Sequence, residues 1–537
     1  MAACQIPARV SVGMLVATGV MVLYMLRVNL SVAIVAMVRT PTTSTLNNSP
    51  EIKRSYCQKL DVVESSSVNI SFDGYELLQN NITQVDNPTY EEDALAEQTD
   101  QLLLTGPQKG MVLGGFFYGY VITSIPGGRL AELYGTKIVF GGSILLSGIL
   151  TLFTPVAARF SYVALILIRI LIGIAQGVVY PSMHVLVARW IPPLERPRFI
   201  SITYMGNCLG TIITLPMCGV IIDSLGWEAV FYICGAIAIV WIAFWCLLMF
   251  DSPSNHPRIS EKEREYILES ISDGTTKQKP NQTPWCAFMT SLPLWAINMA
   301  HVGGMFCFTL LLTQLPTYMD SVLGFSIRNN GLLSSLPFLA QFLGSTTCGC
   351  VGDYLLTRNY ITRSTSRRIF ATVSLVLPAI ILVAVGYVGC NITWAVVLFP
   401  VSAGCLGAFG AGHLANHLDL APNFAGTLLG LSNTIAFSIS MLAPIIVGAM
   451  TPDQSLQQWQ YVFWLNGVIC IACLVFFMIF AKFEIQPWNY CMEEKIEKLA
   501  KEEEKKSFLG LPFRPNTLGK KRERETEGGV GDAEEHY

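Results

Sequence analysis

Charged residues are scarce in this chain. Asp, Glu, Lys and Arg make up 14% of its 537 residues, against about 25% in an average soluble domain. Between Phe370 and Pro452 the only charged residue is Asp419. A soluble chain of this length would divide into several domains with polar surfaces, which this composition does not supply. The net charge of −3 comes without a basic stripe, so we expect no nucleic-acid partner.

The short motifs of common enzymes are missing as well. The sequence contains no nucleophile elbow, no Walker loop and no HExxH pair, so we expect neither catalytic residues nor enzyme activity. His413 and His417 have a spacing that could hold a metal ion, but Asp419 is the only suitable further ligand beside them. We therefore expect no metal site and no resident cofactor.

The sequence is rich in long apolar stretches. Hydrophobic residues make up 52% of the chain and recur in runs of about 20, the length of a helix that crosses a bilayer. The run from Val10 to Val38 is too long for a signal peptide and lacks a clear cleavage site, so we interpret it as a retained span. The sequence predicts an all-α membrane protein with twelve spans, at about 10–38, 110–128, 138–158, 161–188, 199–223, 227–250, 291–319, 328–352, 370–389, 392–415, 424–449 and 459–482.

Three polar segments divide these spans. In the middle one, Ser260 and Glu263 have the spacing of a capping box, which predicts a short amphipathic helix. The predicted domains are an N-terminal six-helix bundle over 1–250 with an outer loop at 39–109, a cytoplasmic linker at 251–290, a C-terminal six-helix bundle over 291–482, and a disordered cytoplasmic tail at 483–537.

The positive charges predict the orientation. The short loops after spans two, four and eight carry most of the Lys and Arg, which places these loops and both termini in the cytoplasm. Cys57 and Cys390 fall in polar stretches, unlike most of the fifteen cysteines, and could pair as a disulfide. Four N-x-Ser/Thr sequons lie on the predicted outer side, and we expect glycosylation at Asn47, Asn69, Asn81 and Asn391.

The two halves of the chain repeat each other. A Gly followed four residues later by an acid occurs after span two, at Gly128, and again 221 residues later after span eight, at Gly349. A G-x-x-x-G pair recurs in spans five and eleven, and small residues at this spacing let helices approach closely. The repeat predicts two parallel six-helix halves with a site between them near the bilayer midplane. The loop motif predicts a conformational gate formed by Gly128, Arg129, Glu132, Gly135, Lys137 and Asp353.

Two arginines lie deep inside predicted spans. Arg27 is in span one and Arg169 in span four, and the spans offer no obvious carboxylate for either. A charge at the centre of a spanning helix costs about 2.5–3.5 kcal/mol on insertion scales. The side chains could extend to the bilayer surface or bind backbone carbonyls. Alternatively, the missing counter-ion is the substrate, because guanidinium groups bind carboxylate and phosphate in a bidentate manner.

Span four carries further polar residues on nearly the same face as Arg169. Gln176 follows after two turns, and Tyr180 and His184 come at four-residue steps. We expect this stripe to line a cavity. In the second half, Asn416 and Asn433 are candidates for contacts with substrate or sodium, beside Ser432. His301 could respond to protons or only form a hydrogen bond with a neighbour.

Seven stretches carry a resemblance to a known family. The chain resembles the sodium/anion cotransporter family of the major facilitator superfamily, which includes sialin, the vesicular glutamate transporters, the type I sodium–phosphate cotransporters and their insect relatives. The resemblance covers about 10–490. It rests on LRVNLSVAIVAMV, GYVITSIPGGRLAELYGTK, RWIPPLERPRF, GWEAVFYICG, LLTQLPTYM, NHLDLAPNFAGTLLGLSN and APIIVGAM with WQYVFWLNG.

The resemblance implies that Arg27 and Arg169 bind the substrate anion. The vesicular glutamate and sialic-acid members carry a Glu where this chain has Gln176, which cannot titrate. Leu113 and Gly304 stand where the glutamate transporters have His and Arg. These departures disfavour vesicular glutamate transport and proton-driven export.

We therefore expect a secondary active transporter of inorganic phosphate or small organic anions that works by alternating access and is coupled to sodium. The alternatives are a proton-coupled, sialin-like exporter of organic anions from an acidic organelle, and an anion channel. The expected partners are a small anion, a co-transported sodium ion or proton, and the bilayer, with a monomer as the functional unit. We expect the plasma membrane rather than a lysosomal or vesicular one.

Overall fold

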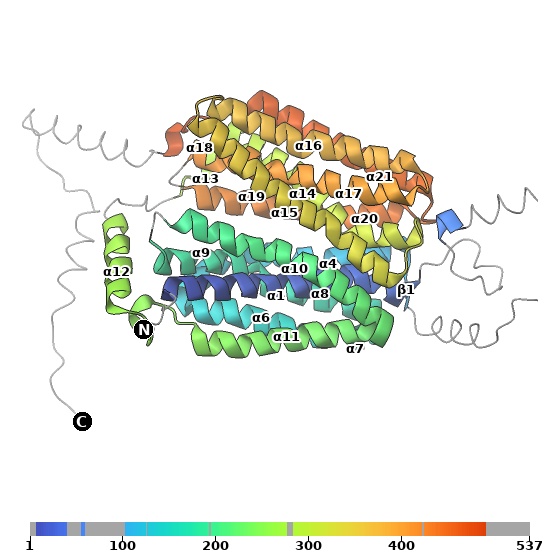
Figure 1. The fold of residues 1–537 in the computed structure, drawn as a ribbon, viewed down its shortest axis with the longest axis horizontal. Helices are drawn as coiled ribbons and strands as arrows, with labels where there is room; N and C mark the ends of the chain where they lie inside the picture. Colours follow the sequence, from blue (N-terminus) through green and yellow to red (C-terminus); the bar gives the residue numbers. More distant parts are fainter. Residues whose placement is uncertain are drawn as a thin grey trace, which may run out of the picture.

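The computed structural model describes residues 7–39, 55–58, 102–124, 126–192, 195–275, 283–421 and 424–489. Its helices form two bundles that lie side by side (Figure 1). The first contains α1 (Ala8–Met37), α4 (Gly106–Ser124), α5 (Gly127–Tyr134), α6 (Thr136–Leu152), α7 (Thr154–Phe160), α8 (Tyr162–Gly177), α9 (Val179–Trp190), α10 (Arg196–Leu225) and α11 (Trp227–Leu248). Two-residue strands, β1 (Val38–Arg39) and β2 (Leu102–Leu103), pair in parallel beside it.

The second bundle follows a linker that contains η2 (Pro253–Asn255), α12 (Glu261–Thr275) and α13 (Trp285–Thr290). It is formed by α14 (Leu292–Ser321), α15 (Ile327–Thr357), α16 (Arg363–Val388), α17 (Ile392–Leu406), η3 (Gly407–Phe409), the π-helical η4 (Gly410–Leu414), α18 (Asn416–Leu420), α19 (Ala425–Ser440), α20 (Leu442–Met450), α21 (Leu456–Phe480) and η6 (Pro487–Asn489). Each bundle has its own main hydrophobic core.

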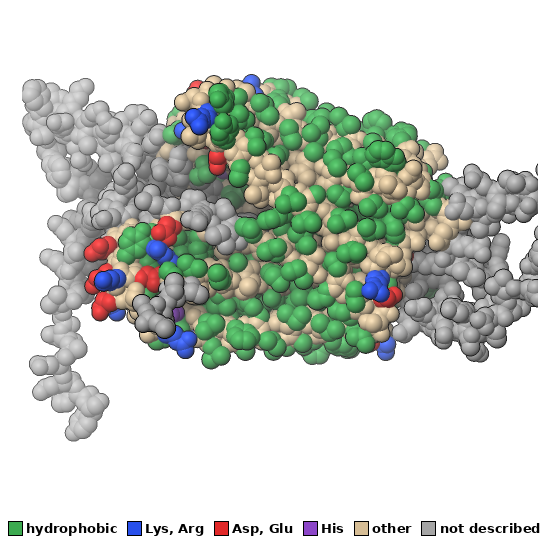
Figure 2. Space-filling model, in the orientation of Figure 1, with side chains coloured by type: hydrophobic (Ala, Val, Ile, Leu, Met, Phe, Trp, Pro, Cys, Tyr) green, Lys and Arg blue, Asp and Glu red, His purple; other side chains and the backbone are tan. Residues whose placement is uncertain are grey.

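The length and apolarity of the helices explain why they cross a membrane. In the described residues nine helical spans are both long enough and apolar enough to cross a membrane, and the bent pair α6–α7 makes a tenth. The second and eighth predicted spans correspond to α4 and α15, which are long but less apolar than the others. Hydrophobic side chains cover the flank of both bundles, and charged side chains gather at the two ends (Figure 2). An apolar belt of this kind is the surface that a bilayer covers.

Glycine brings the two bundles together at the end that carries β1. Gly106 of α4 lies against Gly448 of α20, and a Cβ added to either residue would collide with the carbonyl oxygen of the other. Gly219 of α10 also lies against Gly331 of α15, where an added Cβ would meet the carbonyl oxygen of Ile327 or Leu215, respectively. Side chains at these positions would force the helices apart, so the absence of a Cβ lets this end of the molecule close.

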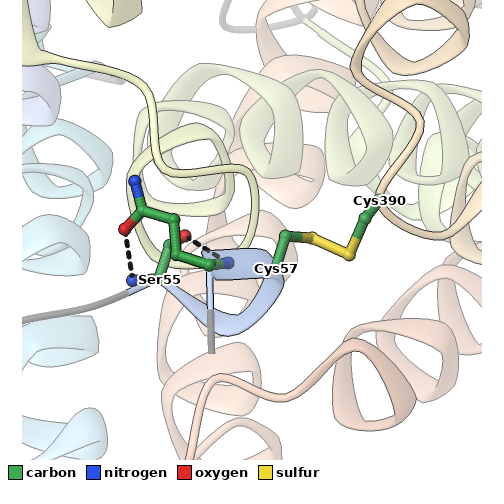
Figure 3. Close-up of a disulfide and its surroundings, with 4 residues drawn as sticks. Ser55, Cys57 and Cys390 are labelled. Carbon is green, nitrogen blue, oxygen red and sulfur yellow. Dashed lines mark hydrogen bonds between the residues drawn. A yellow bond between two sulfur atoms is a disulfide. The ribbon is translucent and has the colours of Figure 1, made fainter. Parts of the chain in front are cut away.

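The described part of the outer loop rests on the second bundle. Cys57 forms a disulfide with Cys390, between α16 and α17 (Figure 3), so the pairing that the sequence left open does occur. The Cys57 amide also donates to the Val322 carbonyl at 3.1 Å. Asn391 is exposed, and its side-chain oxygen caps α17 by accepting from the Trp394 amide at 3.3 Å. The other expected glycosylation positions, Asn47, Asn69 and Asn81, lie outside the described residues.

The linker helix α12 differs from its prediction in one contact. The Ser260 hydroxyl accepts from the Glu263 amide at 3.3 Å, as in a capping box. The Glu263 carboxylate, however, accepts from the amides of Ala8 and Arg9 at 3.0 and 3.1 Å rather than from Ser260. The first amides of a helix have no partner within that helix. Glu263 therefore caps α1, and the predicted reciprocal box is wrong in this half.

Candidate functional site

Arg27 is enclosed by aromatic rings in the interior of the molecule. Its side chain is 8% exposed, and Nε and Nη2 have no hydrogen-bond partner. The guanidinium carbon lies 4.6 Å from the ring centre of Phe116 and 4.9 Å from that of Phe117. Three more rings lie within 5.3–5.6 Å, those of Tyr24, Tyr120 and Phe437.

This aromatic cage explains how the charge is tolerated. Cation–π contacts contribute about 2 kcal/mol when the cation is desolvated, and a charge at mid-bilayer costs about 2.5–3.5 kcal/mol. The rings can therefore offset much of the cost without supplying a negative charge. Phe437 is the one ring of the cage that comes from the second bundle, on α19. The cage is complete only while the two bundles are close together.

Arg169 lies on α8 and is 1% exposed. Its Nη2 donates to the side-chain oxygen of Asn29 at 3.3 Å, while Nε has no partner. Asn29 is two residues beyond Arg27 on α1, so one helix supplies the first guanidinium and orients the second. Gly119 of α4 and Gly173 of α8 allow these helices to touch backbone to backbone, because a Cβ at either position would collide with the facing carbonyl oxygen.

Both guanidinium groups line one small cavity. Its volume is about 20 Å³, enough for roughly one water molecule. Ser31 and Leu113 also line it, and the second bundle contributes Leu312 and Thr313 from α14. In the described residues no carboxylate forms an ion pair with Arg27 or Arg169. Neither side chain extends to the lipid-facing surface. The cavity therefore brings two cations together and, at this volume, has room for no solute larger than a water molecule.

The rest of the predicted stripe on span four lies outside this cavity. Gln176 is fully buried, and both of its amide atoms lack a partner. The helix breaks at Val178, between α8 and α9, so Tyr180 and His184 belong to a separate helical segment. The Tyr180 hydroxyl donates to Asn207 of α10 at 2.7 Å, and His184 is half-buried.

Histidines form a buried polar cluster in the second bundle. Nδ1 of His301 lies 3.4 Å from Nε2 of His413, and Nε2 of His301 lies 2.8 Å from the Asn433 oxygen. His413 belongs to the π-helical segment η4, and π-bulges within helices are frequent at functional sites. Asn416, on α18, is fully buried with both amide atoms unpartnered. Neither Asn416 nor Asn433 lines the cavity that holds the two arginines.

Two further contacts complete this region. His417 joins α18 to α19, because its Nε2 lies 2.8 Å from the Ser432 hydroxyl. The lone carboxylate of the long uncharged stretch, Asp419, forms an ion pair with Arg367 of α16 at 2.7 Å. Asp419 is therefore already neutralised and does not serve as a counter-ion for either buried arginine.

The expected gate lies at the end of the bundles that carries the N-terminus. Gly128, Arg129 and Glu132 are on α5, and Asp353 is exposed near the end of α15. Gly135 turns the chain from α5 to α6 with φ = 90°, a conformation that favours glycine. Asp251 holds this turn by accepting from the Lys137 amide at 2.8 Å and from the Thr136 hydroxyl at 3.0 Å. The Lys137 ammonium donates to the Cys246 carbonyl at 2.8 Å.

Several residues of the site were not found from the sequence. Asn29 starts an N-x-Ser sequence inside the first predicted span, where no glycosylation is expected, and Phe437 is one aromatic residue among many in an apolar helix. Phe116 and Phe117 follow two glycines in span two, a local pattern that gives no sign of a nearby cation. Asp251 lies 114 residues from Lys137, whose amide it accepts from, so no local pattern in the sequence identifies it.

Comparisons with known proteins agree with the fold. The family model of the Major Facilitator Superfamily matches residues 16–444. Human sialin is 39% identical over 481 residues, covering 90% of this chain and 90% of sialin. Human vesicular glutamate transporter 2 is 38% identical over 392 residues, covering 72% of this chain and 67% of that protein.

Solved structures show the same architecture at low sequence identity. A bacterial homologue of the human lysosomal transporter Spinster, inward-facing and occupied, aligns with a TM-score of 0.60 at 14% identity, covering 88% of this chain and 97% of its own. The xylose transporter XylE from E. coli, partially occluded and inward open, aligns with a TM-score of 0.56 at 13% identity, covering 88% and 98%. With a family model that matches most of its length and a relative 39% identical over 90% of it, this chain belongs to the major facilitator superfamily.

Proposed function

We propose that this chain is a secondary active transporter that carries a small anion between Arg27 and Arg169. The observation that carries the proposal is the pair of buried guanidinium groups in one cavity, with no carboxylate paired to either in the described residues. The names of the relatives, sialin and vesicular glutamate transporter 2, support it, since sialic acid and glutamate are both carboxylates. Rocking of the two bundles would expose this site to one side of the membrane and then the other.

The proposed substrates are inorganic phosphate or small organic anions, moved together with sodium. A potential of 100 mV opposes entry of each negative charge into a negative cell by about 2.3 kcal/mol, so uptake needs co-transported cations. Gln176 supports coupling to sodium rather than to protons, because an amide side chain is not protonated and deprotonated during transport. We further propose a monomer in the plasma membrane with both termini in the cytoplasm.

Uptake by the purified chain in proteoliposomes tests this proposal. Radiolabelled phosphate and a panel of mono- and dicarboxylates would be offered with an inward sodium gradient, with potassium in its place, and with a pH gradient alone. We expect saturable uptake that sodium accelerates at least tenfold and that shows counterflow, which separates a carrier from a channel. Flux that rises linearly with concentration, or no uptake of any anion, would contradict the proposal.

A proton-coupled transporter of organic anions is the second candidate. The observation that favours it is the buried pair of His301 and His413, with imidazole nitrogens 3.4 Å apart. A Cβ at Gly304 would lie 3.7 Å from the His413 ring, so the pair stands beside the position where the resemblance expects an arginine. Imidazole is the side chain whose ordinary pKa lies nearest neutrality. Uptake driven by the pH gradient without sodium would select this candidate over the first.

A further inference from the structure

A large groove lies at the end of the first bundle where α1 begins. Its volume is about 960 Å³, and its walls come from the start of α1, the end of α11 and the linker that leads into α12. In Figure 1, α12 stands across the ends of the bundle helices rather than parallel to them. The groove therefore lies where a bilayer surface would meet the linker. It is separate from the cavity that contains Arg27 and Arg169.

One wall of the groove is apolar and open. Met14 of α1 is 59% exposed and Leu247 of α11 is 74% exposed, with Leu248 beside them. These residues belong to helices that span the membrane and continue the apolar belt of the flank. Exposed side chains of this kind at the edge of a bundle are covered by acyl chains in a bilayer.

The other wall is cationic. Arg9, Arg258 and Lys262 line the groove, and Glu263 is the only acidic residue among the described residues that line it. The Glu263 carboxylate is already occupied by the first amides of α1. Arg9 is occupied as well, because it pairs with Glu195 at 3.2 Å and lies over the Tyr266 ring.

The two remaining cations have no acidic partner among the residues that the structure describes. Arg258 and Lys262 are exposed, and neither forms an ion pair with any carboxylate in the described part of the chain. The first acidic residue of α12 does not neutralise them. Glu261 pairs with Arg264 at 2.7 Å, and neither of these two residues lines the groove. Within the described part of the chain, the groove therefore combines two positive charges that no carboxylate pairs with and an apolar wall.

We propose that this groove binds an acidic phospholipid from the adjacent leaflet. Arg258 and Lys262 contact the phosphate and the second negative group of the headgroup, and the acyl chains lie along Met14 and Leu247. The charge complementarity selects an anionic headgroup, and the apolar wall selects a ligand with long chains over a soluble anion. In the proposed orientation this leaflet is cytoplasmic, the one that carries the anionic lipids. Because α12 caps α1 from the same groove, the lipid contacts both the linker and the first span.

Native mass spectrometry of the purified full chain tests this site. The protein in detergent would be titrated with phosphatidylserine and, separately, with phosphatidylcholine. Each exposed basic residue near an anionic lipid surface contributes enough for roughly a fivefold change in affinity, so Arg258→Gln with Lys262→Gln should weaken the tightest phosphatidylserine site about 25-fold. Phosphatidylcholine should bind that site weakly in both proteins.

A matched variant controls for the loss of two positive charges elsewhere on the protein. Arg358→Gln with Arg363→Gln removes two exposed arginines, one just after α15 and one at the start of α16, so the charge changes equally, and this variant should retain the tight site. Equal affinity in the groove variant and the unmodified chain would overturn the proposal, as would an equal loss in the matched variant. Displacement of the bound lipid by millimolar inorganic phosphate would also overturn it, because the apolar wall would then contribute nothing.

Discussion

At the scale of single residues, Asn29 decides how Arg169 is presented. Its amide oxygen is the acceptor for the Arg169 guanidinium, and it is fully buried. An amide oxygen orients the guanidinium without neutralising it, so the positive charge stays available to a ligand. A carboxylate at the same position would form a buried ion pair and compete with the substrate.

We therefore expect Asn29→Asp to reduce anion uptake at least tenfold. The variant should still fold, because it pairs a buried charge instead of leaving one unpaired. Uptake in proteoliposomes and the melting temperature measure the two effects. The control is Asn207→Asp, which places a carboxylate at the Tyr180 contact on α10 instead. Uptake by Asn29→Asp at the level of the unmodified chain would show that Arg169 needs no free charge.

The sequence predicts Arg27 and Arg169 because an arginine inside an apolar run is visible without any structure. It does not predict Asn29 or Phe437. Their roles depend on which sides of the helices pack against each other. Neither residue type is unusual in a membrane span. Asn416 and Asn433 show the opposite case. Their polarity singles them out, but the fold places them in the histidine cluster or beside it rather than in the arginine cavity.

At the scale of helices, glycine positions determine which elements can touch. The sequence repeat predicts the same close approach in spans five and eleven, yet the two differ. A Cβ at Gly210 would collide with α1, whereas a Cβ at Gly430 would meet nothing within 4 Å. The spacing of the small residues can be read from the sequence, but the helix that packs against them cannot. Only the packed structure separates a contact glycine from one that faces open space.

Gly448 provides the corresponding test. We expect Gly448→Ala to separate α20 from α4, because the added methyl group collides with the Gly106 carbonyl. Amide hydrogen exchange should accelerate in peptides that contain residues 106–110 and 444–448, and uptake should slow severalfold as the closed form of this end is destabilised. Gly430→Ala is the matched variant and should change neither measurement. Unchanged exchange in Gly448→Ala would show that this contact does not close the end that carries β1.

At the scale of the whole molecule, the fold holds two desolvated cations at the boundary between two bundles. The aromatic cage takes four rings from the first bundle and one, Phe437, from the second. Residues of both bundles also line the arginine cavity. Opening the boundary therefore removes Phe437 from Arg27 while it admits a solute. Most of the spans follow from apolar length, and the division into two halves follows from the repeat spacing. The closed state of the cavity cannot be predicted in this way, because that state depends on contacts between segments that are distant in the sequence.

In the proposed mechanism, no described carboxylate pairs with Arg27 or Arg169 because the substrate neutralises both. The most direct test of this mechanism is binding of a radiolabelled substrate anion to the purified Arg27→Ala, Arg169→Ala variant, with Arg358→Ala, Arg363→Ala as the matched control. We predict that saturable binding is lost in the first and retained in the second. The first variant should melt at or above the temperature of the unmodified chain, because two unpaired buried charges are gone. Equal affinity in the Arg27→Ala, Arg169→Ala variant and the unmodified chain would contradict the account.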